Sequence, residues 1–181
     1  MTNWLELKNS LKLDNPATAI DDEFTIELKT GEKVTLVCEL VRKGRATFFT
    51  KDLLEDTHSM DEGWITGYKA HLSTLDGYLK KLFRLLPDDL QTVIRGGKLR
   101  LLREREVFGE NRYGELEDCE WLPRYRDAKN RVKRLSGVPF SYWLSTPTAR
   151  SFMNFCGVDS GGSSGCSSAG GGYGVCFGFD I

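Results

Sequence analysis

The hydrophobic positions at the start of the chain recur every three or four residues. This spacing predicts a short amphipathic helix over residues 3–13, with Trp4, Leu7 and Leu11 on its apolar face. An Asn-Pro pair follows, and proline disfavours helix at its own position and at the one before it. We therefore expect residues 1–20 to be an N-terminal helix and linker.

The pattern then changes to the alternation that is typical of strands. Apolar and polar residues alternate over 24–28, a β-branched run covers 34–41, and a third apolar run covers 46–49. Short turns that contain glycine separate these runs, so the segment predicts a three-stranded meander. The acidic and polar stretch 51–62, which contains His58, is expected to be an exposed loop.

The clearest helical pattern runs from about residue 66 to residue 86. Its apolar residues recur at spacings of three and four and form one wide stripe. The stripe consists of Tyr68, Leu72, Leu75, Leu79, Leu82 and Leu86. A second helix is expected over 87–94, because proline and two acids suit a helix start and Gly96-Gly97 suits its end.

Four further segments complete the pattern before the C-terminal region. Residues 98–102 predict a strand, 109–123 a long polar loop with embedded aromatic residues, 124–135 a basic helix and 140–144 a strongly apolar strand.

The composition indicates a globular domain and argues against several functional classes. With 181 residues, 40% of them hydrophobic, the chain is large enough for one domain with its own core. The net charge of -1 gives no overall positive field for nucleic acid. The N-terminus has neither the basic nor the apolar region of a signal peptide, and no run approaches the roughly 20 apolar residues of a membrane span.

The chain contains five cysteines: Cys38, Cys119, Cys156, Cys166 and Cys176. Their number is odd and no CxxC pair occurs, so we expect mostly free thiols in a reducing compartment. Cys38 and Cys119 are expected to act as small, partly buried apolar residues.

The composition changes sharply at residue 151. Glycine and serine dominate the rest of the chain, which usually indicates a flexible linker or tail. Here, however, apolar runs at 151–158 and 174–181 bracket the Gly/Ser stretch, and such runs join sheets. We therefore expect a loop held between two ordered strands, which is a common place for a binding function. Residues 154–181 also contain no Lys, Glu, Gln, Met or Trp, and turn chemistry explains only part of that absence.

Short motifs over residues 24–181 occur in an order and spacing that together are fairly specific for one protein family. They are FFTKDLL at 48–54, Gly63-Trp64, LPDDLQTVI at 86–94, an acidic turn at 105–109, YWLSTP at 142–147, VDSGG at 158–162 and GVCFGFDI at 174–181. In this order they resemble the variable proteins of diversity-generating retroelements and, more broadly, a domain family of phages and gut bacteria. Two departures are clear: Ser145 stands where the family commonly has Arg, and Cys176-Phe177 replaces Arg-Pro.

The resemblance implies a C-type lectin-like fold, within the α+β class, with antiparallel sheets and two or more flanking helices. It implies a single domain over 1–181, in which 21–150 are scaffold and 151–181 are a variable, ligand-binding region. Trp143, Phe177 and Phe179 would anchor the scaffold.

Adenine-directed mutagenesis is the device of this family, and it cannot produce the five missing residue types from Asn-type codons. The variable positions that the resemblance implies are Gly157, Asp159, Gly161, Ser163, Gly165, Cys166, Ser167, Ser168, Gly171 and Tyr173, with Asn154, Cys156 and Cys176 as further candidates. The scaffold positions between them would be Val158, Gly162, Ala169, Gly174 and Val175.

The implied activity is binding, not catalysis. A rigid core would present changeable side chains to a ligand, most simply a protein on a target surface, and the chain could be displayed on a virion or a cell surface. No cofactor, metal, nucleic acid or membrane insertion is implied. Tyr173 is the one evident aromatic anchor among glycines and serines, so we expect this copy to bind a protein ligand weakly.

Three other interpretations of single motifs stay open. Formylglycine-generating enzymes share the C-type lectin-like fold and use paired active-site cysteines, so Cys156, Cys166 and Cys176 are the candidates for such an activity. A nucleophilic cysteine needs a nearby base, and the chain's only histidines are His58 and His71. The acidic residues Glu55, Asp56, Asp61 and Glu62 are a weak calcium signal and more simply a solvated loop. The basic residues Arg124, Arg126, Lys129, Arg131, Lys133 and Arg134 are a weak nucleic-acid signal and more simply a solvated helix face. A structural phage component without a ligand of its own is a further alternative.

Overall fold

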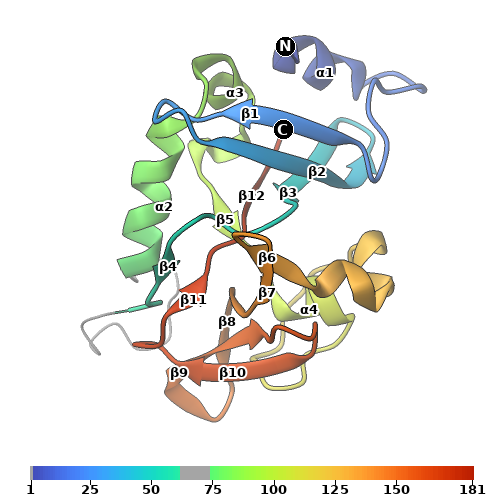
Figure 1. Cartoon of the computed structure of the whole chain (residues 1–181). Helices are drawn as coiled ribbons and strands as arrows, with labels where there is room; N and C mark the ends of the chain where they lie inside the picture. Colours follow the sequence, from blue (N-terminus) through green and yellow to red (C-terminus); the bar gives the residue numbers. More distant parts are fainter. Residues whose placement is uncertain (1, 62–73) are drawn as a thin grey trace. The chain divides into compact units, whose positions relative to one another are not determined.

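The computed structural model describes residues 2–61 and 74–181, and the chain in it forms two compact units (Figure 1). The first unit comprises residues 1–51, 79–99 and 177–181, and the second comprises residues 52–78 and 100–176. The predicted region 151–181 is thus divided, because residues 177–181 belong to the first unit. The predictions of one domain over 1–181 and of a scaffold over 21–150 stay predictions.

The first unit is built on the meander that the sequence predicts. Its strands are adjacent in the order β1-β2-β3-β12 and all pair antiparallel (Figure 1). Their bounds are Glu23–Glu27 for β1, Lys33–Arg42 for β2, Arg45–Thr50 for β3 and Phe177–Asp180 for β12. The prediction of three strands over 24–50 is confirmed.

An aromatic cluster forms the core of this unit. The ring of Phe48 lies 5.6 Å from Trp4, 5.6 Å from Phe24 and 5.7 Å from Phe179, measured between ring centroids. Phe48 is fully buried and Phe179 is 1% exposed, as expected of a scaffold anchor. Residues from the first helix, the meander and the C-terminus therefore share one core.

The helices predicted before residue 95 are present. They are α1 at Trp4–Ser10, α2 at Thr74–Leu85 and α3 at Asp88–Val93, followed by the 3₁₀ turn η2 at Arg95–Gly97. Of the predicted apolar stripe, Leu75, Leu79, Leu82 and Leu86 are buried. Tyr68 and Leu72, together with Glu62, Gly63, Trp64 and His71, lie outside the described residues.

The second unit holds a five-stranded sheet in the order β10-β9-β8-β11-β4. The strands are β4 at Thr57–His58, β8 at Tyr142–Thr148, β9 at Ser151–Val158, β10 at Ser164–Ser168 and β11 at Tyr173–Gly174. Only β8 and β11 pair parallel; the other neighbours pair antiparallel. The remaining elements are β5 at Arg100–Leu101, α4 at Glu104–Phe108 and the hairpin of β6 at Lys133–Leu135 with β7 at Val138–Phe140. The α+β class is therefore correct, with mostly antiparallel sheets.

The prediction of a basic helix over 124–135 is wrong. The segment forms two 3₁₀ turns, η3 at Pro123–Arg126 and η4 at Ala128–Arg131, followed by strand β6. Several of its cations stack on aromatic rings of the same unit: Arg126 over Trp121 at 5.5 Å, and Arg131 over the Phe108 ring at 5.1 Å. Lys133 is 2% exposed. Arg126 and Arg131 therefore pack on rings of their own unit, and the six cations do not line one helix face.

Three smaller predictions also need correction. Residues 51–62 are not simply an exposed loop, because β4 lies within them and Leu54 and Met60 are buried. The last strand does not alternate between an inner and an outer face: Cys176 to Phe179 are all buried. Residues 105–109, expected as a turn, belong mostly to α4, which ends at Gly109 with φ 77°, where the ring of Trp121 leaves no room for a Cβ atom. None of the described helices is long and apolar enough to cross a membrane.

Candidate functional site

The predicted variable region is organised around the hairpin of β9 and β10 (Figure 1). The sequence predicts a loop throughout the Gly/Ser stretch, whereas Ser164–Ser168 forms strand β10. This segment has no large apolar residue, so its strand comes from backbone pairing with β9 and not from side-chain burial. Strand β10 is also an edge of its sheet.

Asp159 holds the tip of the hairpin. Its Oδ1 atom accepts hydrogen bonds from the backbone N–H groups of Gly161, at 2.9 Å, and Ser163, at 2.8 Å. The backbone of Asp159 also donates to the carbonyl of Ser163 and accepts from Gly162. Aspartate side chains commonly stabilise turns in this way. Asp159 is exposed, as a variable position should be, but its carboxylate is occupied by the turn.

Gly162 joins the tip to the rest of the unit. Its φ of +84° favours glycine, and an added Cβ atom would lie only 3.2 Å from Val132 and 3.3 Å from the carbonyl of Ala128. The tip therefore packs on η4 and on the residue after it. Gly162 is thus constrained by its backbone and its neighbours, and its place as a scaffold position stays a prediction.

Burial separates the two predicted classes of position. All five predicted scaffold residues are buried: Val158, Gly162, Ala169, Gly174 and Val175. Most of the predicted variable residues are exposed or half-buried, namely Asn154, Asp159, Gly161, Ser163, Gly165, Cys166, Ser167, Ser168, Gly171 and Tyr173.

Three predicted variable residues, Cys156, Gly157 and Cys176, are buried. In this sequence they add nothing to an exposed surface, and their variability stays a prediction. Ser160, Gly170 and Gly172 are exposed in the same segment, although the family pattern does not select them. In the sequence, only the neighbouring glycines indicate that these three positions are exposed.

A buried carboxylate, that of Glu104 on α4, forms hydrogen bonds that hold one face of the hairpin in place. Glu104 is fully buried and accepts hydrogen bonds from the backbone N–H groups of Arg112, Tyr113 and Gly114, at 3.1, 3.2 and 2.9 Å. The hydroxyl of Ser164 on β10 donates to the same carboxylate at 2.9 Å. A buried charge is tolerated when several donors surround it, so this cluster fixes β10 without using apolar side chains.

A second carboxylate extends this network. The backbone N–H of Glu104 donates to the Thr146 hydroxyl, which in turn donates to Glu117 Oε2 at 2.9 Å. Burial raises the pKa of Glu117, although the hydrogen bonds from Thr146 and Asn111 act in the opposite direction. The network therefore joins α4, β8 and the loop at 111–117.

Tyr173 covers the other side of the sheet. Its ring stacks on Trp143 with centroids 4.5 Å apart. A Cβ atom added at Gly157 would lie 3.0 Å from the Tyr173 ring and 3.0 Å from the carbonyl of Tyr142. The one aromatic residue among the predicted variable positions is thus half-buried, and it needs glycine at 157.

The glycines of the site differ in the room around them. A Cβ atom at Gly165 would meet nothing within 4 Å, and at Gly161 it would touch only Asp159 Oδ1, at 3.4 Å. At Gly171 it would lie 2.9 Å from Ser167 Oγ and 3.1 Å from the carbonyl of Ser168. Positions 161 and 165 can therefore accept side chains directly, whereas 157 and 171 depend on their neighbours.

His58 belongs to this sheet and not to a free loop. It pairs with Tyr173 between β4 and β11, and its ring stacks on Tyr78 at 3.9 Å. Its carbonyl accepts a hydrogen bond of 2.7 Å from Trp143 Nε1. These contacts give the imidazole a packing role.

Three of the five cysteines lie where burial disfavours the thiolate form. Burial raises the pKa of the Cys156 thiol, and the neighbouring Glu104 carboxylate raises it further. Burial also raises the pKa of Cys38, to about 11, and that of Cys119. A fast-reacting thiolate needs a positive field or a base, so none of these three thiols is activated by its surroundings. Among the described residues, no His, Cys, Asp and Glu side chains gather as a metal-binding group.

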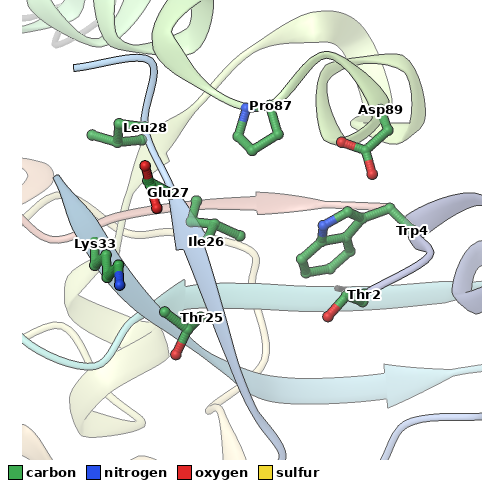
Figure 2. A pocket seen from close by; sticks show the side chains of 9 residues that line it. All are labelled: Thr2, Trp4, Thr25, Ile26, Glu27, Leu28, Lys33, Pro87 and Asp89. Carbon is green, nitrogen blue, oxygen red and sulfur yellow. The ribbon is translucent and has the colours of Figure 1, made fainter. Parts of the chain in front are cut away.

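A separate pocket of about 570 Å³ lies within the first unit. Figure 2 shows Trp4, Pro87 and Asp89 around strand β1, which contributes Thr25, Ile26 and Glu27. Trp4 and Ile26 are buried parts of the core, whereas Glu27 and Asp89 are exposed. Its size would suit a small ligand, but its charged groups are solvated and none of its residues lies in 151–181.

Comparison with protein-family models, curated proteins and solved structures finds no match to this chain.

Proposed function

We propose that this chain is a ligand-binding protein that presents a diversified surface on a C-type lectin-like scaffold, with retroelement mutagenesis as the source of diversity. The separation of burial along residues 154–175 carries the proposal. Expected scaffold positions are all buried, and most expected variable positions are exposed or half-buried. An ordinary glycine-rich tail would have no reason to follow this pattern.

The way in which β10 is held supports the same function. The hydrogen bonds of Glu104 and Asp159 end on Ser164 and on backbone groups, so they fix the hairpin without using the exposed side chains of Cys166 and Ser168. A binding surface that changes by mutation needs this independence, because each new side chain must leave the fold intact. The exposed and half-buried residues of 159–172, together with Tyr173, form the proposed ligand-binding surface.

The ligand class follows from the chemistry of this surface. It is the edge strand of a sheet, with hydroxyl and backbone groups and one half-buried aromatic ring. Such a surface suits a macromolecular partner, most simply a protein. Since Tyr173 is stacked on Trp143, this copy has little to offer as a binding hot spot, and its affinity should be weak.

The test is to sequence the genomic DNA on both sides of the gene. The proposal expects a near-copy of the 3′ end beside a reverse transcriptase gene, differing from it only where the copy has adenine. The differences should fall in codons such as those of Gly161, Gly165 and Ser168, while codons of buried positions such as Val158 and Ala169 should be identical. Without such a copy the diversification fails, and a phage structural role or an enzyme-like domain without diversification becomes the better interpretation.

A further inference from the structure

Two cysteines stand directly opposite each other in the candidate site. Cys156 on β9 and Cys166 on β10 are Cα partners in the antiparallel register, and both thiols are free. Cys156 is fully buried, whereas Cys166 is exposed. The pair therefore joins the inner strand of the hairpin to its outer edge.

The hydrogen bonds of the ladder define what kind of pair this is. Asp159 donates to the carbonyl of Ser163, and Ala169 donates to the carbonyl of Met153, so both pairs belong to the hydrogen-bonded set. Hydrogen-bonded and non-hydrogen-bonded pairs alternate along an antiparallel ladder. Positions two residues apart on one strand are therefore of the same type, so 155 and 157, like 153 and 159, are hydrogen-bonded. Position 156, opposite 166, lies between them and is a non-hydrogen-bonded pair.

A pair of this kind has the spacing that a disulfide needs. Opposite residues at non-hydrogen-bonded positions have Cα atoms about 4.5 Å apart, and their side chains share one face of the sheet. Disulfides span Cα separations of about 4.4–6.8 Å. Joining the two sulfur atoms therefore requires changes of side-chain rotamer and no shift of either strand.

We infer that Cys156 and Cys166 form a redox pair, which closes into a cross-strand disulfide when the protein meets an oxidising thiol–disulfide pool. This inference does not depend on the proposed binding function. The Cys166 thiolate attacks a small disulfide such as glutathione disulfide, whose S–S bond breaks and releases one glutathione thiolate. Cys156 then loses its proton to solvent, and its thiolate attacks the Cys166 sulfur and releases the second glutathione. Two protein thiols are oxidised by two electrons, and glutathione disulfide is reduced to two thiols that take up the two protons.

The different surroundings of Cys166 and Cys156 determine which of the two thiol–disulfide exchange steps is slow. The exposed Cys166 is the accessible thiol, so it reacts first. Burial and the Glu104 carboxylate raise the pKa of Cys156, which keeps it protonated and slows the closing step. When Cys156 gives up its proton, Glu104 keeps the Ser164 hydroxyl and its backbone donors, so its charge stays satisfied. The mixed disulfide at Cys166 should therefore accumulate briefly before the hairpin closes.

The test uses the full chain under native conditions. The purified protein is incubated with glutathione buffers of increasing oxidised fraction, free thiols are blocked by alkylation, and proteolytic peptides are mapped by mass spectrometry. The expected result is a peptide pair linked through Cys156 and Cys166 in a monomer, preceded by glutathione attached to Cys166. Stable glutathione on Cys166 without closure, or a link from Cys166 to another cysteine, would overturn the inference.

Matched variants separate closure from general oxidation. Cys166→Ser and Cys156→Ser should each abolish the link, whereas Cys38→Ser, which changes a buried thiol of the first unit, should leave it intact. Oxidised wild type should unfold at a higher temperature than the reduced protein, and the Cys166→Ser variant should show no such difference. The wild-type peptide map needs no variant, so the result stands even if Cys156→Ser fails to fold.

Discussion

Strand β3 in the first unit and strand β10 in the second reach the same backbone geometry by opposite means. Five of the six residues of β3 are buried, including the large rings of Phe48 and Phe49. No residue of β10 is buried, and its largest side chain is that of Cys166. Side-chain packing therefore holds β3 in place, whereas backbone pairing and two carboxylates hold β10.

The contrast between the two strands indicates where the sequence can change without loss of the fold. In β3, side-chain volume contributes directly to the stability of the core, so each residue is constrained. In β10, the stabilising groups are backbone atoms, Glu104 on α4, and Asp159 and Gly162 at the hairpin tip. Most side chains of β10 are consequently not needed for the fold, and a binding function can use them. Four substitution experiments test this comparison.

The largest effect should come from removing a ring of the first core. Phe48→Ala deletes the ring that contacts Trp4, Phe24 and Phe179, and should destabilise the protein by about 3–5 kcal/mol. Denaturant unfolding measures the loss, with Ser168→Ala on β10 as the control that should change stability by less than about 0.5 kcal/mol. Equal effects of the two substitutions would remove the distinction between the strands.

The next effect should come from Glu104. Glu104→Ala leaves the N–H groups of 112–114 and the Ser164 hydroxyl without their acceptor, at about 1–3 kcal/mol for each donor that stays buried. We expect a loss of about 3 kcal/mol and faster amide hydrogen exchange at 112–114 and in β10. Asp118→Ala, which removes an exposed acid of the same unit, is the matched control. If exchange in β10 stays at the wild-type rate, Glu104 does not fasten this strand.

Two glycines of the candidate site should respond differently to the same change. Gly157→Ser crowds the Tyr173 ring and should cost about 1–3 kcal/mol, whereas Gly165→Ser enters open space and should cost less than about 0.5 kcal/mol. Adding Tyr173→Ala to Gly157→Ser should recover part of the loss, because the ring no longer occupies that space. Additive effects in this double-mutant cycle would show that positions 157 and 173 vary independently.

The smallest effect concerns pH. Because burial raises the folded-state pKa of Glu117, the stability linked to its proton is complete below about pH 4.3 and is lost as pH rises through the folded pKa. Glu117→Gln should remove this loss and raise the unfolding temperature at pH 7 by less than about 4 °C, with little change at pH 4. The measurement is the difference between variant and wild type across this range, and a gain that is larger at pH 4 than at pH 7 would have the wrong sign.

The sequence predicts the elements whose signal lies in their own apolar residues. Strands β1 to β3, helices α1 and α3, and α2 as far as the structure describes it all follow from hydrophobic spacing. Strand β10 does not, because glycine and serine carry no periodic signal and its geometry comes from pairing with β9. The segment 124–135 has a helical composition, but its cations stack on rings such as Trp121 and Phe108, which periodicity cannot anticipate.

Some features of the candidate site can likewise be predicted from the sequence, and others cannot. Burial within 154–175 separates most of the expected variable positions from the expected scaffold positions, because a strand and a tight turn constrain which side chains point inward. The buried Cys156 and Gly157 are exceptions. The role of Glu104 could not be predicted, since its main partners are backbone N–H groups that have no sequence signature. The pairing of Cys156 with Cys166 likewise needs the register of the hairpin, which spacing alone does not give.

Two combinatorial libraries of equal size test whether the exposed positions of the hairpin tolerate substitution better than the buried ones. One randomises Gly161, Ser163, Gly165 and Ser168, and the other randomises Val158, Gly162, Ala169 and Val175. Protease resistance of the displayed proteins, read by sequencing before and after selection, reports which members fold. We predict that most members of the first library survive and few of the second do. Equal survival of the two libraries would contradict the account, because the exposed positions would then be no freer to vary than the scaffold.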